Sequence, residues 1–352
     1  MKIQNIRFDK IDLPLVKPFR VALGTINKQT NVIVWIETDD GYVGIGEAAP
    51  FQPVTGENVD HIIAALKILR PLLLGQDATC IERIHNIMDA EIIYNSSAKA
   101  AIDIALFDIL GKRLGQPLYK VLGGASNSVL TDMTIGMGEI DEMIAEAKEW
   151  VAAGFSVLKI KVGEGRERDI ATVAGLREAL GHAVRMRLDA NQAWSRGDAR
   201  YILRHIERYG IEAVEQPLPH YDVEGMAELR TVSSISIMAD EAVHVPSDAL
   251  RIVDSKAADL VNIKLMKAGG LLPALKINTI CEAANIRCMV GCMVESRISI
   301  TAAASLVAAQ RNITEADVDS FMYFKDDTIR GGFEVTGGKI TLSEEPGLGI
   351  VL

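Results

Sequence analysis

Five charged residues recur at nearly constant spacing through the middle of the chain. Each stands at the polar end of a short apolar run, and successive members are separated by 28, 26, 25 and 24 residues: Lys161, Asp189, Glu215, Asp240 and Lys264. The three carboxylates would form a hard oxygen site, which suits Mg²⁺ because this ion binds carboxylates, water and substrate oxygens. Neither histidine nor cysteine occupies these five positions, which counts against zinc.

A pair of lysines lies within the first of these runs. In VLKIKVG, at 157–163, Lys159 and Lys161 point to the same face of a strand. An unpaired buried ammonium is costly, so both need nearby anions, which the following strand ends supply. Removing a proton α to a carboxylate creates an enediolate, whose charge a divalent cation stabilises. A lysine with a lowered pKa can take that proton, and Lys264 opposite can return one, which inverts the stereocentre.

Each of these residues taken alone has a more ordinary explanation. An aspartate at a strand end is usually a helix cap or a loop residue, and a Lys-x-Lys pair usually lies on a solvated edge. Five matching positions on five consecutive strands are much harder to explain in this way. We therefore interpret the set as one site.

Alternating strands and helices would bring the five residues together. Eight short apolar runs alternate with amphipathic helical stretches, at 131–136, 157–163, 184–191, 211–217, 236–241, 259–265, 287–293 and 312–319. This alternation predicts βαβ units and a parallel sheet. In a closed parallel barrel the C-terminal strand ends meet at one mouth. We therefore predict a parallel β/α barrel over residues 123–318.

The regions on either side of the barrel have a different pattern. Residues 1–122 contain an alternating N-terminal strand, a predicted antiparallel hairpin at 31–50 and helical periodicity at 57–75 and 96–115, which predicts an α+β capping domain. In the C-terminal segment, 319–352, the stretch GGFEVTGGKITL predicts another hairpin. We expect this segment to return to the capping domain.

Composition narrows the class of protein. The 352 residues carry a net charge of −10, which argues against a nucleic-acid surface and against an anionic membrane partner. The four cysteines form no Cys-x-x-Cys pair, so structural zinc and a disulfide framework are not expected. No stretch resembles a transmembrane span or a signal peptide, which favours the cytoplasm.

The series KIK, DAN, EQP, DE and NIK resembles the muconate-lactonizing branch of the enolase superfamily, over essentially the whole chain. The resemblance implies a modified (β/α)8-type barrel, of the form (β/α)7β, with a capping domain completed by the C-terminal tail. It implies one Mg²⁺ per subunit on the three carboxylates and catalytic roles for Lys161 and Lys264. Lys159 would help to neutralise the substrate carboxylate and depress the pKa of Lys161. A homo-oligomer is also implied.

The sequence EADVDS distinguishes among the reactions of this branch. Asp317 and Asp319 share one face at the end of the eighth run, and dipeptide epimerases resemble the chain here, with an Asp-x-Asp that binds the free α-ammonium. Paired carboxylates in a partly dry mouth suit an ammonium. The resemblance implies an epimerase that inverts the C-terminal residue of a dipeptide by metal-assisted 1,1-proton transfer. The alternatives are an o-succinylbenzoate synthase, an N-succinylamino acid racemase, or a non-catalytic metal-binding protein on the same scaffold.

Side-chain specificity is expected to depend on the loop between the first two strands. Gly24 stands where the Ala-Glu epimerases of this family carry an arginine, and a glycine cannot pair a carboxylate, so Ala-Glu activity should be weak. Phe19, Ile26 and the loop 51–57 instead predict an apolar lid. Hydrophobic dipeptides are therefore the first expectation.

Two glutamates leave a second possibility open. Glu57 or Glu295 could face a cationic side chain, which keeps Lys- or Arg-containing dipeptides as candidates. Either glutamate alone is more often a loop or scaffold residue. The expected substrate-binding set also includes Thr134 and Met293.

Overall fold

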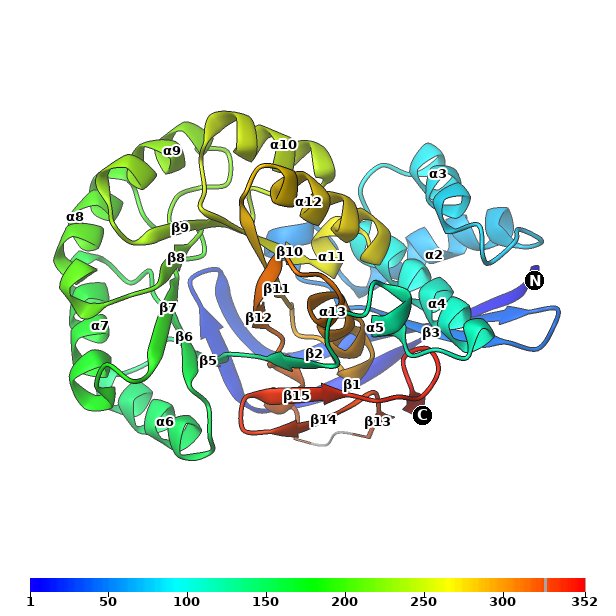
Figure 1. The fold of residues 1–352 in the computed structure, drawn as a ribbon, viewed down its shortest axis with the longest axis horizontal. Coiled ribbons are helices and arrows are strands. Elements are labelled where there is room, and N and C mark those ends of the chain that lie inside the picture. The colour runs from blue at the N-terminus through cyan, green and yellow to red at the C-terminus, as the bar shows by residue number, and fades with distance from the viewer. Residues whose placement is uncertain (326–327, 352) are drawn as a thin grey trace.

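The computed structural model describes residues 1–325 and 328–351, and Figure 1 shows their arrangement. An antiparallel sheet opens the chain, with strands β1 (Ile3–Val21), β2 (Gly24–Thr38) and β3 (Val43–Ala48) in that order. The predicted hairpin at 31–50 is β2 paired with β3. In the described residues no helix is long and apolar enough to cross a membrane.

Five helices accompany this sheet: α1 Gln52–Thr55, α2 Val59–Leu73, α3 Ile81–Glu91, α4 Ser96–Leu114 and α5 Leu118–Val121. The predicted helices at 57–75 and 96–115 correspond to α2 and α4, and Gly115 ends α4 in the left-handed conformation, as a Gly cap should. Helix α4 lies against β3 because Gly46 has no side chain: a Cβ there would lie 1.9 Å from the carbonyl oxygen of Ala101. Helix α3 was not predicted.

Eight parallel strands form the barrel, neighbours in space in chain order: β5 Met133–Ile135, β6 Val157–Lys161, β7 Arg185–Asp189, β8 Ala213–Glu215, β9 Ser236–Ala239, β10 Leu260–Lys264, β11 Arg287–Gly291 and β12 Ile313–Asp317. All eight predicted runs are strands. The backbone N–H of Asp132, just before β5, donates to the carbonyl of Ala316 in β12, which joins the first and last strands.

Helices on the outside connect the barrel strands (Figure 1): α6 Ile140–Ala152, α7 Arg166–Leu180, α8 Arg196–Ile206 with the 3₁₀ helix η1 Glu207–Tyr209, α9 Val223–Val232, α10 Pro246–Ser255, α11 Leu265–Ala268, α12 Leu271–Ala283 and α13 Arg297–Ala309. In the part of the chain that the structure describes, each of the first seven strands is followed by an α-helix, whereas β12 is followed by the 3₁₀ helix η2 (Ser320–Tyr323). The predicted (β/α)7β form is confirmed.

The C-terminal segment divides its contacts between two regions. Its strands are β13 Arg330–Gly331, β14 Phe333–Thr336, β15 Lys339–Leu342 and β16 Ile350–Val351. The predicted hairpin is β14–β15, but it pairs with β4 (Ser128–Leu130) next to the barrel and not with the N-terminal sheet. Its inward residue Ile340 is fully buried there. The expected return is made by later residues, because the Leu348 N–H donates to Asp108 of α4 (2.8 Å).

Buried polar contacts fix the N-terminal sheet to the barrel. Glu47 in β3 accepts hydrogen bonds from the backbone N–H groups of Ser296 and Ser299, at 2.9 and 3.1 Å, where α13 begins. The side chain of Asn31 in β2 donates to the carbonyl oxygen of Val294 (3.0 Å). These contacts hold the β1–β2 hairpin beside the C-terminal ends of the barrel strands.

Candidate active site

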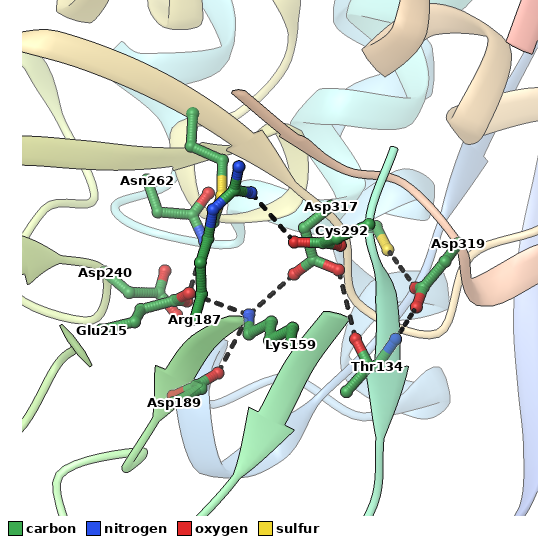
Figure 2. A network of polar contacts seen from close by, with 12 residues as sticks. Thr134, Lys159, Arg187, Asp189, Glu215, Asp240, Asn262, Cys292, Asp317 and Asp319 are labelled. Atoms are coloured by element: carbon green, nitrogen blue, oxygen red, sulfur yellow. Dashed lines mark hydrogen bonds and ion pairs between the residues drawn. The ribbon is translucent and has the colours of Figure 1, made fainter. Parts of the chain in front are cut away.

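The five evenly spaced residues converge at the C-terminal ends of the barrel strands. Figure 2 shows three of them, Asp189, Glu215 and Asp240, beside Lys159. Lys161, Asp189, Glu215 and Lys264 are the last residues of β6, β7, β8 and β10, and Asp240 directly follows β9. All five side chains are buried. Constant spacing in the sequence thus corresponds to one position repeated on successive β/α units.

Lys159 is buried within β6 because its ammonium forms ion pairs with carboxylates on three other strands. Its Nζ lies 2.7 Å from Asp317 Oδ2, 2.9 Å from Glu215 Oε2 and 3.0 Å from Asp189 Oδ2 (Figure 2). Burial alone would lower the pKa of Lys159, but the surrounding carboxylates, Asp189 foremost, raise it well above its usual value. One ammonium therefore holds together carboxylates from three strands.

Lys161 and Lys264 each contact one carboxylate of the cluster, and Lys267 is ion-paired with Asp240 as well. Lys161 Nζ lies 2.6 Å from Asp189 Oδ2 and donates to Asn191 Oδ1 at 3.1 Å. Lys264 Nζ lies 2.8 Å from Asp240 Oδ2. Burial acts to lower the pKa of Lys264, yet Asp240 raises it above its usual value, so this lysine is held as an ammonium. Three strands separate β6 from β10 in the barrel, so the two amines approach the cluster from different sides.

The donor set fits a divalent metal ion. Asp189, Glu215 and Asp240 offer hard carboxylate oxygens from three successive strands, and an ammonium already lies against two of them. Although burial acts to raise the pKa of Asp240, the ammonium of Lys264 holds it well below its usual value. Burial and the neighbouring Asp189 raise the pKa of Glu215 to about 7, so added positive charge would favour its ionised, ligating form.

Asp317 and Asp319 lie on the same side of the pocket but have different partners. Asp317 Oδ2 is ion-paired with Lys159, as described above, and its Oδ1 is 3.4 Å from Thr134 Oγ1. Asp319 Oδ2 accepts hydrogen bonds from the Thr134 backbone N–H at 2.7 Å and from the Tyr323 hydroxyl at 2.6 Å. The Cys292 thiol lies 3.9 Å from Asp319 Oδ1. The two carboxylates are therefore not equivalent: Asp317 already has a cation, and Asp319 has neutral donors.

An apolar wall closes the other side of the same pocket. Its lining residues come from the β1–β2 hairpin, from α1 and the residue before it, and from the segments after β11 and β12: Phe19, Val21, Ile26, Phe51, Val54, Met293, Val294 and Tyr323. Lys159, Lys161, Lys264, Thr134, Asp317 and Asp319 line it too. The structure thus brings the predicted Phe19, Ile26, Thr134 and Met293 together with the lysines.

Gly24 does not line this pocket, contrary to expectation. It is exposed at the turn of the β1–β2 hairpin with φ +143°, and a Cβ built there would meet no atom within 4 Å. Phe19 and Ile26 are cross-strand partners in that hairpin, so the wall comes from the strands and not from their turn. Arg20 is ion-paired with Glu164.

Neither glutamate considered for a cationic side chain lines the pocket. Glu57 accepts a hydrogen bond from the Ser97 N–H at 2.9 Å and so caps the first turn of α4. Glu295 Oε1 accepts from the Met293 N–H at 2.8 Å, and its Oε2 has no hydrogen-bond partner among the described residues. Burial raises the pKa of Glu295 to about 8. The structure therefore does not place Glu295 in the pocket lining, because its side chain turns back onto its own loop, and a substrate-binding role for it stays a prediction.

Asn191, Cys292 and Tyr323 are pocket residues that were not predicted, as are Val21 and Val294. Asn191 reaches Lys161 because it follows β7 in a left-handed conformation, with φ +40°. Cys292 directly follows β11, and its sulfur lies within 4.8 Å of a carboxylate oxygen of both Asp317 and Asp319. Tyr323 ends the 3₁₀ helix η2. The DAN and GCM stretches were the available signals for the first two, whereas nothing local marks Tyr323.

The fold and the site together define a class: a (β/α)7β barrel with an N-terminal α+β cap, whose mouth carries three carboxylates flanked by lysines. Residues 6–123 match the family model of the mandelate racemase / muconate lactonizing enzyme N-terminal domain, and residues 142–352 match that of the enolase C-terminal domain-like family. The chain belongs to the enolase superfamily, in its mandelate racemase and muconate lactonizing enzyme branch.

The chain is similar to curated relatives over nearly its whole length, and three of them illustrate the range of substrates. The hydrophobic dipeptide epimerase of Enterococcus faecalis is 44% identical, covering 99% of both chains. The L-Ala-D/L-Glu epimerase of Bacillus subtilis is 42% identical, covering 100% of this chain and 97% of that protein. The N-succinyl-L-Arg/Lys racemase of Bacillus cereus is 36% identical, covering 99% and 95%. The solved structure of the Enterococcus faecalis dipeptide epimerase with Mg and L-Leu-L-Tyr matches with a TM-score of 0.98, at 44% identity and complete coverage of both chains.

Proposed function

We propose that the protein is a dipeptide epimerase that inverts the α-carbon of the C-terminal residue and prefers apolar side chains. The observation that carries the proposal is one pocket containing three features: Lys161 and Lys264 at the ends of separate strands, an aspartate with only neutral donors, and an apolar wall. The relatedness to a hydrophobic dipeptide epimerase over the full chain supports it.

The metal site supplies charge, and the lysines supply the proton chemistry. We propose one Mg²⁺ per subunit on Asp189, Glu215 and Asp240, where its charge would stabilise the substrate carboxylate as negative charge grows on it and would lower the pKa of the nearby lysines. One lysine, as a neutral amine, takes the α-proton from its side of the carbon. The other, as an ammonium, returns a proton from the opposite side. Inversion follows because the two transfers use different faces.

Asp319 and the apolar wall select the substrate. Asp319 Oδ1 is available to accept a charge-assisted hydrogen bond from the N-terminal ammonium of a dipeptide. Phe19, Ile26 and Met293, which line the pocket, contact the side chains of the bound dipeptide and exclude water from them. An acidic side chain finds no cationic partner on this wall among the described residues, so Ala-Glu is a weak substrate. The proposal further includes a homo-oligomer acting in the cytoplasm.

An N-succinylamino acid racemase on the same lysines is the rival activity, in line with the relative from Bacillus cereus. Its substrates carry an acylated nitrogen, which offers no positive charge to Asp319. The pocket therefore favours a dipeptide over an N-succinylamino acid. Comparing the activity on these two substrate classes tests the proposal.

The test is hydrogen exchange in D₂O. The protein with Mg²⁺ is incubated with pooled L,L-dipeptides and, separately, with N-succinylamino acids, and products one mass unit heavier are sought by mass spectrometry. We expect label at the C-terminal α-position of apolar dipeptides and little in Ala-Glu. Label in N-succinylamino acids alone would transfer the function to the rival activity, and label in neither would refute proton transfer.

A further inference from the structure

Tyr323 contacts both the substrate-recognising carboxylate and the hairpin that covers the pocket. Its hydroxyl donates to Asp319 Oδ2 at 2.6 Å, and its ring stacks on Phe19 with centroids 4.8 Å apart and an interplanar angle of 23°. Phe19 belongs to β1, at the opposite end of the chain. One side chain therefore connects the segment after the last barrel strand with the cover formed by the first two strands.

The hydrogen bond from the Tyr323 hydroxyl occupies Oδ2 of Asp319 and leaves Oδ1 available to bind a substrate. Oδ2 already accepts two hydrogen bonds, from Tyr323 and from the Thr134 backbone N–H. Among the described residues, Oδ1 has the Cys292 thiol at 3.9 Å, which is a weak donor. A carboxylate held by two donors on one oxygen cannot rotate freely, so Oδ1 stays directed at the same point in the pocket.

The hydroxyl also favours the ionised form of Asp319. Burial and the neighbouring Asp317 raise the pKa of Asp319 to about 6, whereas the hydrogen bonds from Tyr323 and Thr134 act to lower it. The titratable or charged groups around this carboxylate are Asp317 on β12, Tyr323 on η2, Cys292 after β11, Asp132 before β5 and Lys159 on β6, which pairs with Asp317. Tyr323 thus opposes the two effects that would neutralise Asp319.

We propose that Tyr323 is a positioning residue that orients Asp319 toward a free α-ammonium, so that the pocket prefers unmodified dipeptides to N-acylated ones. The inference rests on the proposed function. It adds that the preference for a charged amino terminus depends on a residue that does not itself touch that terminus. The stack on Phe19 places this residue, and the hydroxyl carries the effect.

Tyr323→Phe tests the hydroxyl alone, because the ring and its stack remain. We expect KM for an apolar dipeptide to rise about 10-fold, the loss of one hydrogen bond to a charged group, with kcat within about 3-fold. The acid limb of kcat/KM should move to higher pH, because Asp319 is protonated more readily. Exchange into the N-acetylated form of the same dipeptide should stay unchanged. Tyr221→Phe, at an exposed tyrosine outside the pocket, is the matched control and should match the wild type throughout.

Phe19→Leu separates placement from hydrogen bonding. It removes the ring stack and keeps the Tyr323 hydroxyl, so KM should rise while the acid limb moves to higher pH by less than in Tyr323→Phe. If Tyr323→Phe is folded by circular dichroism and keeps the wild-type KM and acid limb, the inference is overturned while the proposed function stands. If equal losses occur with free and N-acetylated dipeptides, Tyr323 has only a structural role. If the wild type labels no dipeptide, the proposed function fails and this inference fails with it.

Discussion

The two sides of the pocket are built in different ways. The charged side consists of residues that stand at the C-terminal ends of neighbouring parallel strands or within two residues of them: Lys159, Lys161, Asp189, Glu215, Asp240 and Lys264. The apolar side consists of Phe19, Ile26, Phe51, Val54, Met293 and Tyr323, which come from a hairpin, a short helix with its flanking residue, and two segments after strands. On the charged side each carboxylate contacts a lysine, whereas on the apolar side Phe19 and Tyr323 stack ring on ring.

This difference separates chemistry from specificity. Groups on strand ends are held by the sheet itself, so their mutual geometry is precise, whereas connecting segments can vary without disturbing the barrel. The three relatives fit this division, because they share the chain over nearly its full length while their names differ in substrate. Substitutions on the charged side should therefore abolish the reaction, whereas substitutions on the apolar side should change which dipeptides are accepted.

The largest effect is expected for a lysine of the charged side. Lys264→Met should reduce epimerisation at least about 10³-fold, because one proton carrier is lost. Lys161→Met should do the same, yet each variant should still exchange the α-hydrogen of one epimer in D₂O, and the two should differ in which. NMR of each purified epimer measures this. Lys276→Met, at an exposed lysine paired with Glu82, is the control. Loss of exchange from the same epimer in both variants would contradict the two-sided mechanism.

Asp319 stands between the charged side and the apolar side of the pocket. The substitution Asp319→Asn should have the next largest effect on activity. It removes the negative charge that meets the ammonium, so kcat/KM for apolar dipeptides should fall about 10²-fold, mainly through KM. Activity on N-succinylamino acids should not fall. Steady-state kinetics with both substrate classes provides the measurement, and an equal loss on both would show that Asp319 does not recognise the ammonium.

Ile26→Arg, on the apolar side, should change the substrate preference. A guanidinium on the lining strand would pair an acidic side chain, so kcat/KM for L-Ala-L-Glu should rise and that for an apolar dipeptide should fall, each about 10-fold. Asn27→Arg, one residue further on the opposite and exposed face, is the matched control and should change neither value. If both variants behave alike, added positive charge and not its place in the pocket would be responsible.

The smallest effect concerns stability and not turnover. The pKa of Glu295 is raised by burial to about 8, above its unfolded value, so the folded protein keeps a proton that the unfolded chain releases. Stability contributed by this group is therefore lost as pH rises from about 4.5 to about 8. Glu295→Gln cannot titrate, so its free energy of unfolding relative to the wild type should rise by at least about 1 kcal/mol between pH 5 and pH 8.5. Urea unfolding at several pH values measures this, and parallel curves would show that Glu295 does not titrate.

The charged side could be predicted from the sequence, and the reason is geometric. Each β/α unit has nearly the same length, so residues at a constant spacing share a position in the barrel, as Lys161 and Lys264 do. The apolar side has no such repeat. Phe19 and Ile26 were predicted by type, but Gly24 was misplaced, because a local sequence does not tell which residues of a long hairpin face another domain. Glu295 does not line the pocket for a different reason, which is that its side chain accepts a hydrogen bond from the backbone two residues earlier.

Tyr323 marks the limit of the sequence argument. Its importance depends on the stack with Phe19, 304 positions away in the chain, and on a 3₁₀ turn that aims it at Asp319. Neither contact has a periodic or local signature. Residues of this kind become visible only when the domains are placed together.

Glu47 has a consequence for how the chain is made. Its carboxylate is buried against the start of α13, and these partners lie 249 and 252 residues later. Leu348, which contacts α4, comes later still. On the ribosome the N-terminal sheet therefore emerges long before the groups that satisfy its buried acid have been synthesised. Domains commonly fold in order of synthesis, but here we expect the first domain to reach its native packing last, after the barrel has left the exit tunnel.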